Sequence, residues 1–301
     1  MMLITIAVVT YNSSKTVLET LDSVKQQTYA EIELIVSDDC STDNTLEIVS
    51  DWTAKNKDRF VRIRLLSSDE NRGIVPNRNK CIREAQGEWI KFADGDDMLT
   101  PNSIQSYLSV MSDEANFIMG NVITMYETGE KTKFTVKQDF FKLNAPEQLA
   151  LYRKNTQIDW PGVIFRTKAL LDLNGLDERF PMFDDIPFFF KAFKAGYKFD
   201  CVDETVVIYR IHKGSVQHSE KFHISHANYL NQIIAPEYLE KKKYLYYWHE
   251  KLWSERRMAQ FNNQPAKVFF IYLLMLISDP KEWYYIMRDK IYRPVVLMWK
   301  K

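Results

Sequence analysis

Apolar and polar positions alternate in blocks along the first hundred residues of the chain. Four apolar runs rich in β-branched or aromatic residues lie at positions 3–9, 32–36, 61–66 and 89–93. Between the first two runs, Val17, Leu21 and Val24 recur at the spacing of one helix face, and Ser13 or Ser14 is expected to cap the start of that helix. Buried parallel strands have near-continuous apolar runs, and helices connect them. The pattern therefore predicts an α/β fold with a Rossmann-like, mostly parallel central sheet and helices on both faces.

The rest of the chain predicts further strands followed by a helical end. Residues 117–126 and 132–136 are expected to form a hairpin, and residues 205–211 are expected to form another strand. A helix is expected to begin at Asp185 and to end at Gly196. We therefore expect a catalytic domain over residues 1–220 and an α-helical C-terminal extension over residues 221–301.

Polar side chains cluster directly after three of the predicted strands. The clusters are Thr10-Tyr11-Asn12, Asp38-Asp39 and Asp94-Gly95-Asp96-Asp97. In a sheet of this kind, ligands bind outside the carboxyl ends of the strands. Mg²⁺ or Mn²⁺ carrying phosphate groups suits such carboxylates, because these ions take only one or two protein oxygens. The alternative is a solvated acidic turn, since Asp and Gly favour turns in any protein.

Two common nucleotide-binding motifs do not occur in the sequence. No G-x-G-x-x-G follows the first predicted strand, and no G-x-x-x-x-G-K-[ST] occurs anywhere. This disfavours a dinucleotide-type site and a P-loop. A nucleotide bound here would have its diphosphate held by a metal ion and carboxylates instead of a glycine loop.

Charge is balanced overall but unevenly distributed. The chain has 40 Lys and Arg and 40 Asp and Glu among its 301 residues, so no net charge favours a nucleic-acid partner. Residues 1–100 carry 12 basic against 17 acidic side chains, whereas residues 237–301 carry 13 against 7. An acidic front and a basic tail indicate different roles for the two regions.

Cysteine usage and hydropathy indicate a cytoplasmic location. The cysteines Cys40, Cys81 and Cys201 are odd in number and far apart, which fits a reducing cytosol and disfavours a disulfide framework or a zinc site. The N-terminal apolar run has no basic leader and reads as a strand. No apolar run reaches the roughly 20 residues that would span a bilayer. We expect a protein that is soluble or peripheral on a membrane.

Five short motifs together resemble the nucleotide half of the inverting GT-A glycosyltransferases of family 2. They are Val9-Thr10-Tyr11-Asn12, Ser37 to Asp43, Asn71-Arg72-Gly73, Pro76 to Asn79 and Phe92 to Asp97. The resemblance implies a GT-A fold with a nucleotide half over residues 1–100 and an acceptor half over 101–220. It also implies transfer of a sugar from a nucleotide donor, UDP-linked, to a hydroxyl group of a glycan acceptor with inversion.

The resemblance implies a role for each matched residue of the nucleotide half. Thr10 and Tyr11 would line the uracil and ribose pocket, and Asp39 would accept a hydrogen bond from uracil. Asn71 and Arg78 would lie near the base, ribose or phosphates. The alternative for Asp39 is an acidic residue at a helix N-terminus, which the helix dipole favours.

Three further residues complete the donor site that the resemblance implies. Asp94 would hold the ribose side of the donor, and Asp96 would coordinate Mn²⁺ or Mg²⁺. His212 lies in the segment Tyr209 to Val216, which resembles the family segment that closes over the donor diphosphate, and would contact the metal or the diphosphate. The alternative for His212 is an ordinary surface or core histidine.

Asp185 matches the general base of the family, although the family most often has Glu-Asp where this chain has Asp184-Asp185. A carboxylate at a helix start can deprotonate a sugar hydroxyl when low-dielectric walls raise its pKa. The alternative is a helix cap, and Asp184 could be that cap while Asp185 is the base. Pro187, in place of a more usual polar residue, alters the local geometry. Trp160 is either an acceptor-sugar platform or a buried core residue.

The basic tail is rich in Trp, Tyr and long apolar side chains, including ten apolar residues at 268–277. This composition is typical of an interfacial helix on an anionic membrane. The alternative is a helical pair that packs on the catalytic domain or on a second subunit of a homodimer. Together with the family resemblance, the basic and aromatic composition of the tail favours a polyprenyl-diphosphate-linked acceptor and a peripheral location on the cytoplasmic face of the inner membrane.

Two other functions are compatible with a Rossmann-like sheet that ends in carboxylates. A sugar-nucleotide nucleotidyltransferase would need a glycine-rich loop after the first strand to hold a triphosphate, and residues 10–14 contain no glycine. A non-catalytic binding protein on a transferase fold is the other alternative, because a fold alone does not prove an activity. The matched carboxylates are all present, which disfavours loss of activity.

Overall fold

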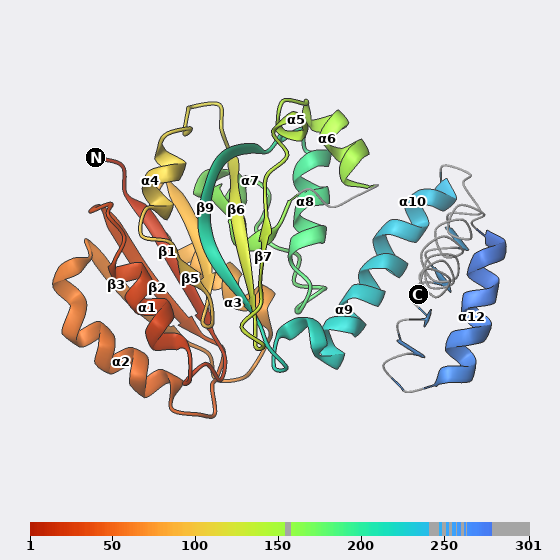
Figure 1. Cartoon of the computed structure of the whole chain (residues 1–301), viewed down its shortest axis with the longest axis horizontal. Coiled ribbons are helices and arrows are strands. Elements are labelled where there is room, and N and C mark those ends of the chain that lie inside the picture. The colour runs from red at the N-terminus through yellow and green to blue at the C-terminus, as the bar shows by residue number, and fades with distance from the viewer. Residues whose placement is uncertain are drawn as a thin grey trace, which may run out of the picture. The chain divides into compact units, whose positions relative to one another are not determined.

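The computed structural model describes residues 1–153, 158–240, 247–248, 251–252, 255–256, 258–259, 262 and 264–278. The chain divides into two compact units, one over Met1–Lys213 and one that begins at Gly214. The first unit contains the whole central sheet (Figure 1).

Four parallel strands form the first part of the sheet, as the apolar runs predict. They are β1 (Ile4–Thr10), β2 (Ile32–Asp38), β3 (Arg62–Ser67) and β4 (Trp89–Asp94), in the order β3-β2-β1-β4. Every residue of β1 and β2 is buried, because helices cover both faces of these strands.

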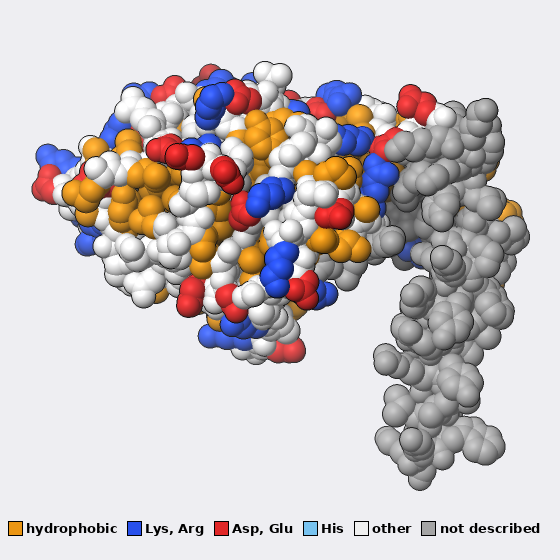
Figure 2. Space-filling model, turned by 90° about the horizontal axis from the view of Figure 1, so that it is seen from above, with side chains coloured by type: hydrophobic (Ala, Val, Ile, Leu, Met, Phe, Trp, Pro, Cys, Tyr) orange, Lys and Arg blue, Asp and Glu red, His pale blue; other side chains and the backbone are white. Residues whose placement is uncertain are grey.

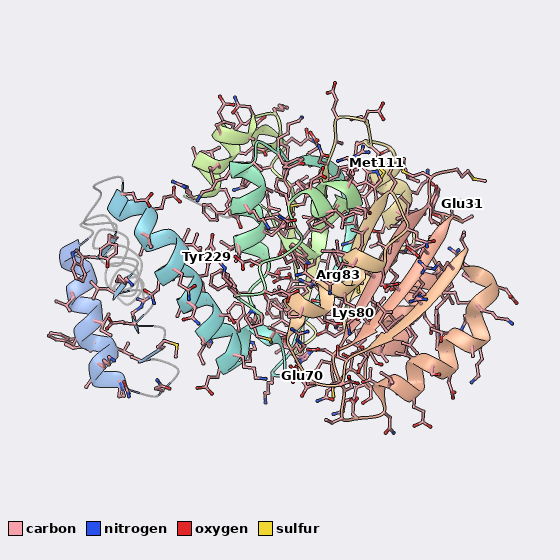
Figure 3. The ribbon with its side chains drawn as sticks, turned by 180° about the vertical axis from the view of Figure 1, so that it is seen from behind. Glu31, Glu70, Lys80, Arg83, Met111 and Tyr229 are labelled. Atoms are coloured by element: carbon pink, nitrogen blue, oxygen red, sulfur yellow. The ribbon has the colours of Figure 1, made fainter. Side chains whose placement is uncertain are left out.

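The connecting helices lie on opposite faces of this parallel part. They are α1 (Val17–Lys25), α2 (Thr45–Asn56) and α3 (Ile74–Glu84). Figure 1 shows α1 and α2 in front of the strands, and Figure 3, seen from behind, shows α3 with Lys80 and Arg83 across the other face. The predicted layers are therefore confirmed. Helix α3 begins directly after Gly73, so the motif residues 71–79 lie at its start.

The sheet continues from β4 with strands of both directions. These are β5 (Met98–Leu99), β6 (Phe117–Tyr126), β7 (Lys131–Phe134), β8 (Val163–Arg166) and β9 (Asp200–Ile211). The order is β4-β8-β6-β9-β5, and β7 pairs with β6 as the predicted hairpin. Strand β8 is antiparallel to β4 and β6, whereas β9 is parallel to β6.

Five helices pack around the second part of the sheet. They are α4 (Ser103–Leu108), α5 (Gln138–Phe141), α6 (Ala145–Tyr152), α7 (Thr167–Asp172) and α8 (Asp185–Lys194). The aromatic rings of Phe117, Phe165 and Phe188 meet edge to face, with centroids 5.5 to 5.8 Å apart. This packing holds α8 against β6 and β8. It therefore also holds Asp185, the first residue of α8, in place.

The predicted start of α1 is wrong. Ser13 or Ser14 was expected to cap this helix, but its N-cap is Thr16 and no side chain caps it. The N–H groups of Ser13 and Ser14 instead donate to Thr45 Oγ1 and Asp43 Oδ2, at 2.8 and 3.1 Å. These bonds join the loop after β1 to the loop after β2 and to the first residue of α2. The two serines therefore stabilise the edge of the sheet where the strands end.

The second unit is helical, with α9 (Glu220–Tyr229), α10 (Ala235–Glu240) and α12 (Pro265–Ser278). The predicted apolar run at 268–277 lies in α12. The part of the predicted helical extension after residue 278 lies outside the described residues. Among the helices that the structure describes, none is both long and apolar enough to cross a bilayer.

On the face shown in Figure 2, acidic and basic side chains of the first unit are intermixed, and small hydrophobic areas lie between them. Such a mixed surface is what the equal numbers of acidic and basic residues in the sequence predict. No basic field of the kind that attracts a nucleic-acid backbone stands out on this face.

Candidate active site

The carboxyl ends of β1, β2 and β4 bring the three predicted polar clusters to one edge of the sheet. Thr10 is paired in register with Asp38, and Val9 is paired with Asp94. The Thr10 hydroxyl donates to Asp38 Oδ1 at 2.7 Å, and Asp38 also accepts from the Ser41 N–H. Thr10 is thus buried and supports the loops, whereas the side chain of Tyr11 is 48% exposed beside it.

Asp39 holds the motif loop Asn71-Arg72-Gly73 against the end of β2. Its Oδ1 accepts from the N–H of Arg72 at 3.1 Å, and its Oδ2 accepts from the N–H of Gly73 at 2.7 Å. Asp39 does not lie in the first turn of α2, which begins only at Thr45, but its carboxylate does meet a helix N-terminus, because Gly73 is the N-cap of α3. Asn71 is partly exposed in the loop that Asp39 holds. Their contacts with a uracil base stay predictions.

Arg78 connects the two halves of the first unit. Its guanidinium is buried, with Nη2 2.5 Å from Asp94 Oδ1 and Nη1 paired with the Asp184 carboxylate. The same guanidinium lies over the Trp160 ring, 4.8 Å from its centroid. The sequence predicts a nucleotide contact for Arg78, and the structure gives it two carboxylate partners.

Asp96 and His212 are brought into contact by the end of β4 and the end of β9. His212 Nε2 lies 2.8 Å from Asp96 Oδ2. Burial, and after it the negative charge of Asp94, raises the pKa of Asp96. Asp97 is buried and accepts the N–H of Arg210 at 3.0 Å, which ties β9 to the acidic turn.

The side chains of Asp96 and His212 fit a divalent cation that carries phosphates. Carboxylate oxygen and imidazole nitrogen are ligands that Mn²⁺ accepts, and Mg²⁺ accepts the oxygen. Within the described ranges, no group of three or more His, Cys, Asp or Glu side chains could hold a metal ion. Two protein ligands are enough where diphosphate oxygens supply the rest.

Asp184 and Asp185 are adjacent in sequence but differ in their surroundings. Asp184 occupies the N-cap position of α8, as the alternative allowed, but its side chain makes no cap hydrogen bond and pairs with the buried Arg78 instead. Asp185 Oδ1 accepts the N–H of Ile186 at 2.6 Å. Burial raises the pKa of Asp185, and the charge of Arg78 opposes the rise. Pro187 is tolerated because it lies in the first turn of α8.

Trp160 is a core residue. It is 6% exposed, and its ring packs 4.6 Å from the Phe165 ring and 5.8 Å from the Phe92 ring. The acceptor-platform prediction is therefore wrong, because neither ring face is open to a sugar. The ring instead packs against the Arg78 guanidinium.

Sequence reasoning missed two charged residues beside the predicted site. Lys91 is fully buried in β4, and its Nζ donates to the carbonyl oxygens of Pro161 and Val163 at 2.5 and 3.3 Å. Burial lowers the pKa of Lys91 to about 7, against the charges of Asp97 and Asp94. Burial and the charge of Asp185 raise the pKa of Asp159 to about 6. For Lys91, the signal in the sequence was a single lysine inside an otherwise apolar strand.

Comparisons with known proteins agree with the predicted resemblance. Residues 5–173 match the family model described as glycosyl transferase family 2. An uncharacterized glycosyltransferase of Methanocaldococcus jannaschii is 26% identical over 294 residues, which cover 92% of this chain and 89% of that protein. The Escherichia coli UDP-Glc:α-D-GlcNAc-diphosphoundecaprenol β-1,3-glucosyltransferase WfgD is 32% identical over 137 residues, which cover 45% of this chain and 52% of that protein.

The fold is similar to that of a solved glycosyltransferase. A crystal structure of a fragment of Staphylococcus aureus TarS in complex with UDP-GlcNAc has a TM-score of 0.60 and 24% identity, and the match covers 86% of this chain and 73% of that chain. TarS is a poly(ribitol-phosphate) β-N-acetylglucosaminyltransferase, 25% identical over 94% of this chain and 48% of the full-length protein. The predicted GT-A fold is confirmed.

The buried amine of Lys91 leads to a prediction about stability and pH. Between pH 7 and 10.5 the unfolded chain holds a proton on Lys91 that the folded chain lacks. The free energy of unfolding should therefore rise with pH in this window, by at most about 1.4 kcal/mol per pH unit from this group. A neutral amine still has two N–H groups for the two carbonyls that it contacts.

Lys91→Met should lack this increment, as measured by denaturant unfolding of both proteins at several pH values. The difference in unfolding free energy between wild type and variant should grow in favour of wild type from pH 7 to 10. Parallel curves across this range would show that the Lys91 pKa is not lowered in the folded chain.

Proposed function

The chain belongs to glycosyl transferase family 2, and we propose that it transfers a sugar from a UDP-linked donor to a hydroxyl group of a lipid-linked glycan, with inversion. The observation that carries this proposal is the pairing of Arg78 with both Asp94 and Asp184. Asp94, which would face the donor, and Asp184, which precedes Asp185 at the start of α8, thus share one buried cation. The names of relatives support the substrates: TarS was crystallised with UDP-GlcNAc, and WfgD acts on a diphosphoundecaprenol-linked sugar.

The donor would lie along the carboxyl ends of β1, β2 and β4. Tyr11, exposed beside the buried Thr10, would cover the base, and Asp39 with Asn71 would meet its edge. Asp94 would accept a hydrogen bond from the ribose side of the donor. Hydrogen bonds hold the loop after β1 and the loop before α3 in place, so little ordering would be needed on binding.

Asp96 and His212 would hold Mn²⁺ or Mg²⁺ against the donor diphosphate. The bound ion would neutralise the charge that develops on the departing diphosphate. The chain itself contributes the fixed positions of Asp96 and His212, which are already in contact.

Asp185 would accept the proton of the acceptor hydroxyl. The hydroxyl oxygen would form a bond to the anomeric carbon as the bond to the diphosphate breaks on the opposite face, through an oxocarbenium-like transition state. Burial raises the pKa of Asp185 and makes it a better base than an ordinary aspartate. Asp184 is unsuited to this role, because Arg78 stabilises its charged form.

The two other functions lose support. A nucleotidyltransferase would need a phosphate-binding glycine loop after β1, and residues 10–14 lack glycine. A purely binding protein would not need a carboxylate at the start of α8 whose pKa is raised by burial.

Asp96→Ala should abolish the gain in UDP affinity that Mn²⁺ gives to the wild type. The remaining carboxylates repel a diphosphate, so UDP should bind at least about tenfold more weakly in the variant. Calorimetry with UDP, with and without Mn²⁺, measures this. Asp113→Ala, which removes an exposed carboxylate, is the control and should behave as wild type. Equal UDP affinity of the wild type in excess EDTA would remove the metal from the proposal.

Asp185→Asn should leave UDP affinity nearly unchanged and lower the transfer rate about 10² to 10⁴-fold, because the general base is lost. Rates with a panel of UDP-sugars and a lipid-linked acceptor measure the effect. Normal turnover of Asp185→Asn together with an inactive but folded Asp184→Asn would show that the base is the other acid.

We further propose that α12 binds an anionic membrane surface, where a lipid-linked acceptor would lie. Phe269 and Phe270 of α12 are 65% and 62% exposed, whereas Ile271 is buried. The sequence from residue 237 onward has six more basic than acidic side chains. Each basic residue that reaches the surface would add roughly 1 kcal/mol of attraction to anionic lipid.

Replacing both Phe269 and Phe270 with Ser should weaken binding to anionic vesicles at least about tenfold, since two apolar side chains no longer insert. Vesicle co-sedimentation measures this, and Leu171→Ser, an exposed leucine of α7, is the control. Deleting residues 264–301 should abolish vesicle binding while donor hydrolysis survives. If these changes convert a dimer to a monomer without affecting vesicle affinity, the tail is a subunit interface.

A further inference from the structure

Asp159 has a fixed backbone and a carboxyl without a protein partner. Its N–H donates to Met119 Sδ at 3.4 Å, and its carbonyl accepts the N–H of Gly162 at 3.0 Å. Among the described residues, no hydrogen bond or ion pair reaches its side-chain oxygens. The chain therefore holds the residue firmly and leaves its charged end available.

Lys91 fixes the segment that carries Asp159 to the strand that carries the donor-side carboxylates. Its amine contacts the carbonyls of Pro161 and Val163, and Lys91 itself lies three residues before Asp94 in β4. On the other side Gly162 lies so close to β6 that a Cβ there would come within 2.7 Å of the Gly120 carbonyl oxygen. Residues 159–163 are thus clamped between β4 and β6.

Asp159 lies near Asp185. It precedes Trp160, whose ring packs on the Arg78 guanidinium, and that guanidinium pairs with Asp184, the residue before Asp185. The charge of Asp185 is the second cause of the raised pKa of Asp159, after burial, and Lys91 opposes it. A partly buried carboxylate without a donor is unfavourable, because the hydrogen bonds that it had with water are not replaced. Hydroxyl groups of a sugar beside Asp185 would supply the missing donors.

We propose that Asp159 is a sugar-binding residue that accepts hydrogen bonds from ring hydroxyl groups of the sugar held next to Asp185. The inference rests on the proposed transferase function and adds a specificity-determining residue to it. Vicinal hydroxyls are the chemistry that the carboxylate selects, whether they belong to the transferred sugar or to the acceptor sugar. Deoxy sugars that lack the contacted hydroxyl should bind less well.

Asp159→Ala and Asp159→Asn, with Asp113→Asn as the control at an exposed site, test the proposal. UDP affinity should stay within twofold of wild type for both variants, since UDP has no sugar ring hydroxyls in this place. Interaction with the sugar should weaken about 10- to 100-fold in Asp159→Ala, the usual range for a charged hydrogen bond. Asp159→Asn should lose less, because its amide oxygen still accepts.

Two measurements identify the sugar. If it is the transferred sugar, the Kd of the UDP-sugar rises while that of UDP does not. If it is the acceptor sugar, the KM for acceptor rises while the rate of UDP-sugar hydrolysis is unchanged. Either result supports the proposal.

Unchanged Kd and KM in Asp159→Ala would overturn it, and so would a parallel loss of UDP affinity and thermal stability, which would make Asp159 structural. Failure of the proposed function is a separate result, because wild type itself would then neither bind UDP nor hydrolyse a UDP-sugar.

Discussion

The buried ion network of Arg78 is the interaction on which the site depends. A guanidinium in the core is costly unless carboxylates compensate its charge, and here Asp94 and Asp184 both do so. One of these acids ends β4 and the other precedes α8, so the cation fixes the distance between the end of β4 and the start of α8. Trp160 and Phe92 cover the guanidinium faces and keep water from weakening the pairs. Removal of the cation would leave two carboxylates facing each other in a half-buried site.

The two halves are joined a second time around helix α3, through backbone contacts that only glycine permits. Gly73 has φ +105°, and a Cβ there would come within 2.6 Å of the Pro181 carbonyl oxygen. The same glycine donates its N–H to Asp39, so one residue contacts both the end of β2 and the loop that leads to Asp184. Further along α3, Asn79 bonds both the N–H and the carbonyl of Leu176, at 2.8 and 3.0 Å. Helix α3 is therefore the mechanical link between the loop after β2 and the start of α8.

The sequence allowed the parallel half of the sheet to be predicted because its strands are buried on both faces and so have uninterrupted apolar runs. It also placed Thr10, Asp39 and Asp94 at one edge, because parallel strands end together. The contact of Asp96 with His212, 116 residues apart, was reachable only through the family resemblance. The partners of Arg78 and the role of Lys91 were not predictable, since a charged side chain in a sequence does not reveal which distant groups compensate it. The predicted cap of α1 is wrong for the same reason, because Ser13 bonds to Thr45, the first residue of α2.

The acidic residues at this edge of the sheet differ in whether a cation or an N–H group compensates their charge. Asp184 has its charge compensated by Arg78, and Asp97 accepts a backbone N–H from β9, so both serve the architecture. Asp96 faces His212, a partner that a bound metal ion would share. Within the part of the chain that the structure describes, no ion pair reaches Asp185 or Asp159, and burial raises the pKa of each. A carboxylate without a compensating charge is the one whose proton affinity and hydrogen-bonding capacity remain available to a substrate. The bonds of Arg78 and Lys91 therefore decide which acids stay available. Arg78 pairs with Asp184 and not with Asp185, and Lys91 binds carbonyl oxygens and makes no ion pair with Asp159.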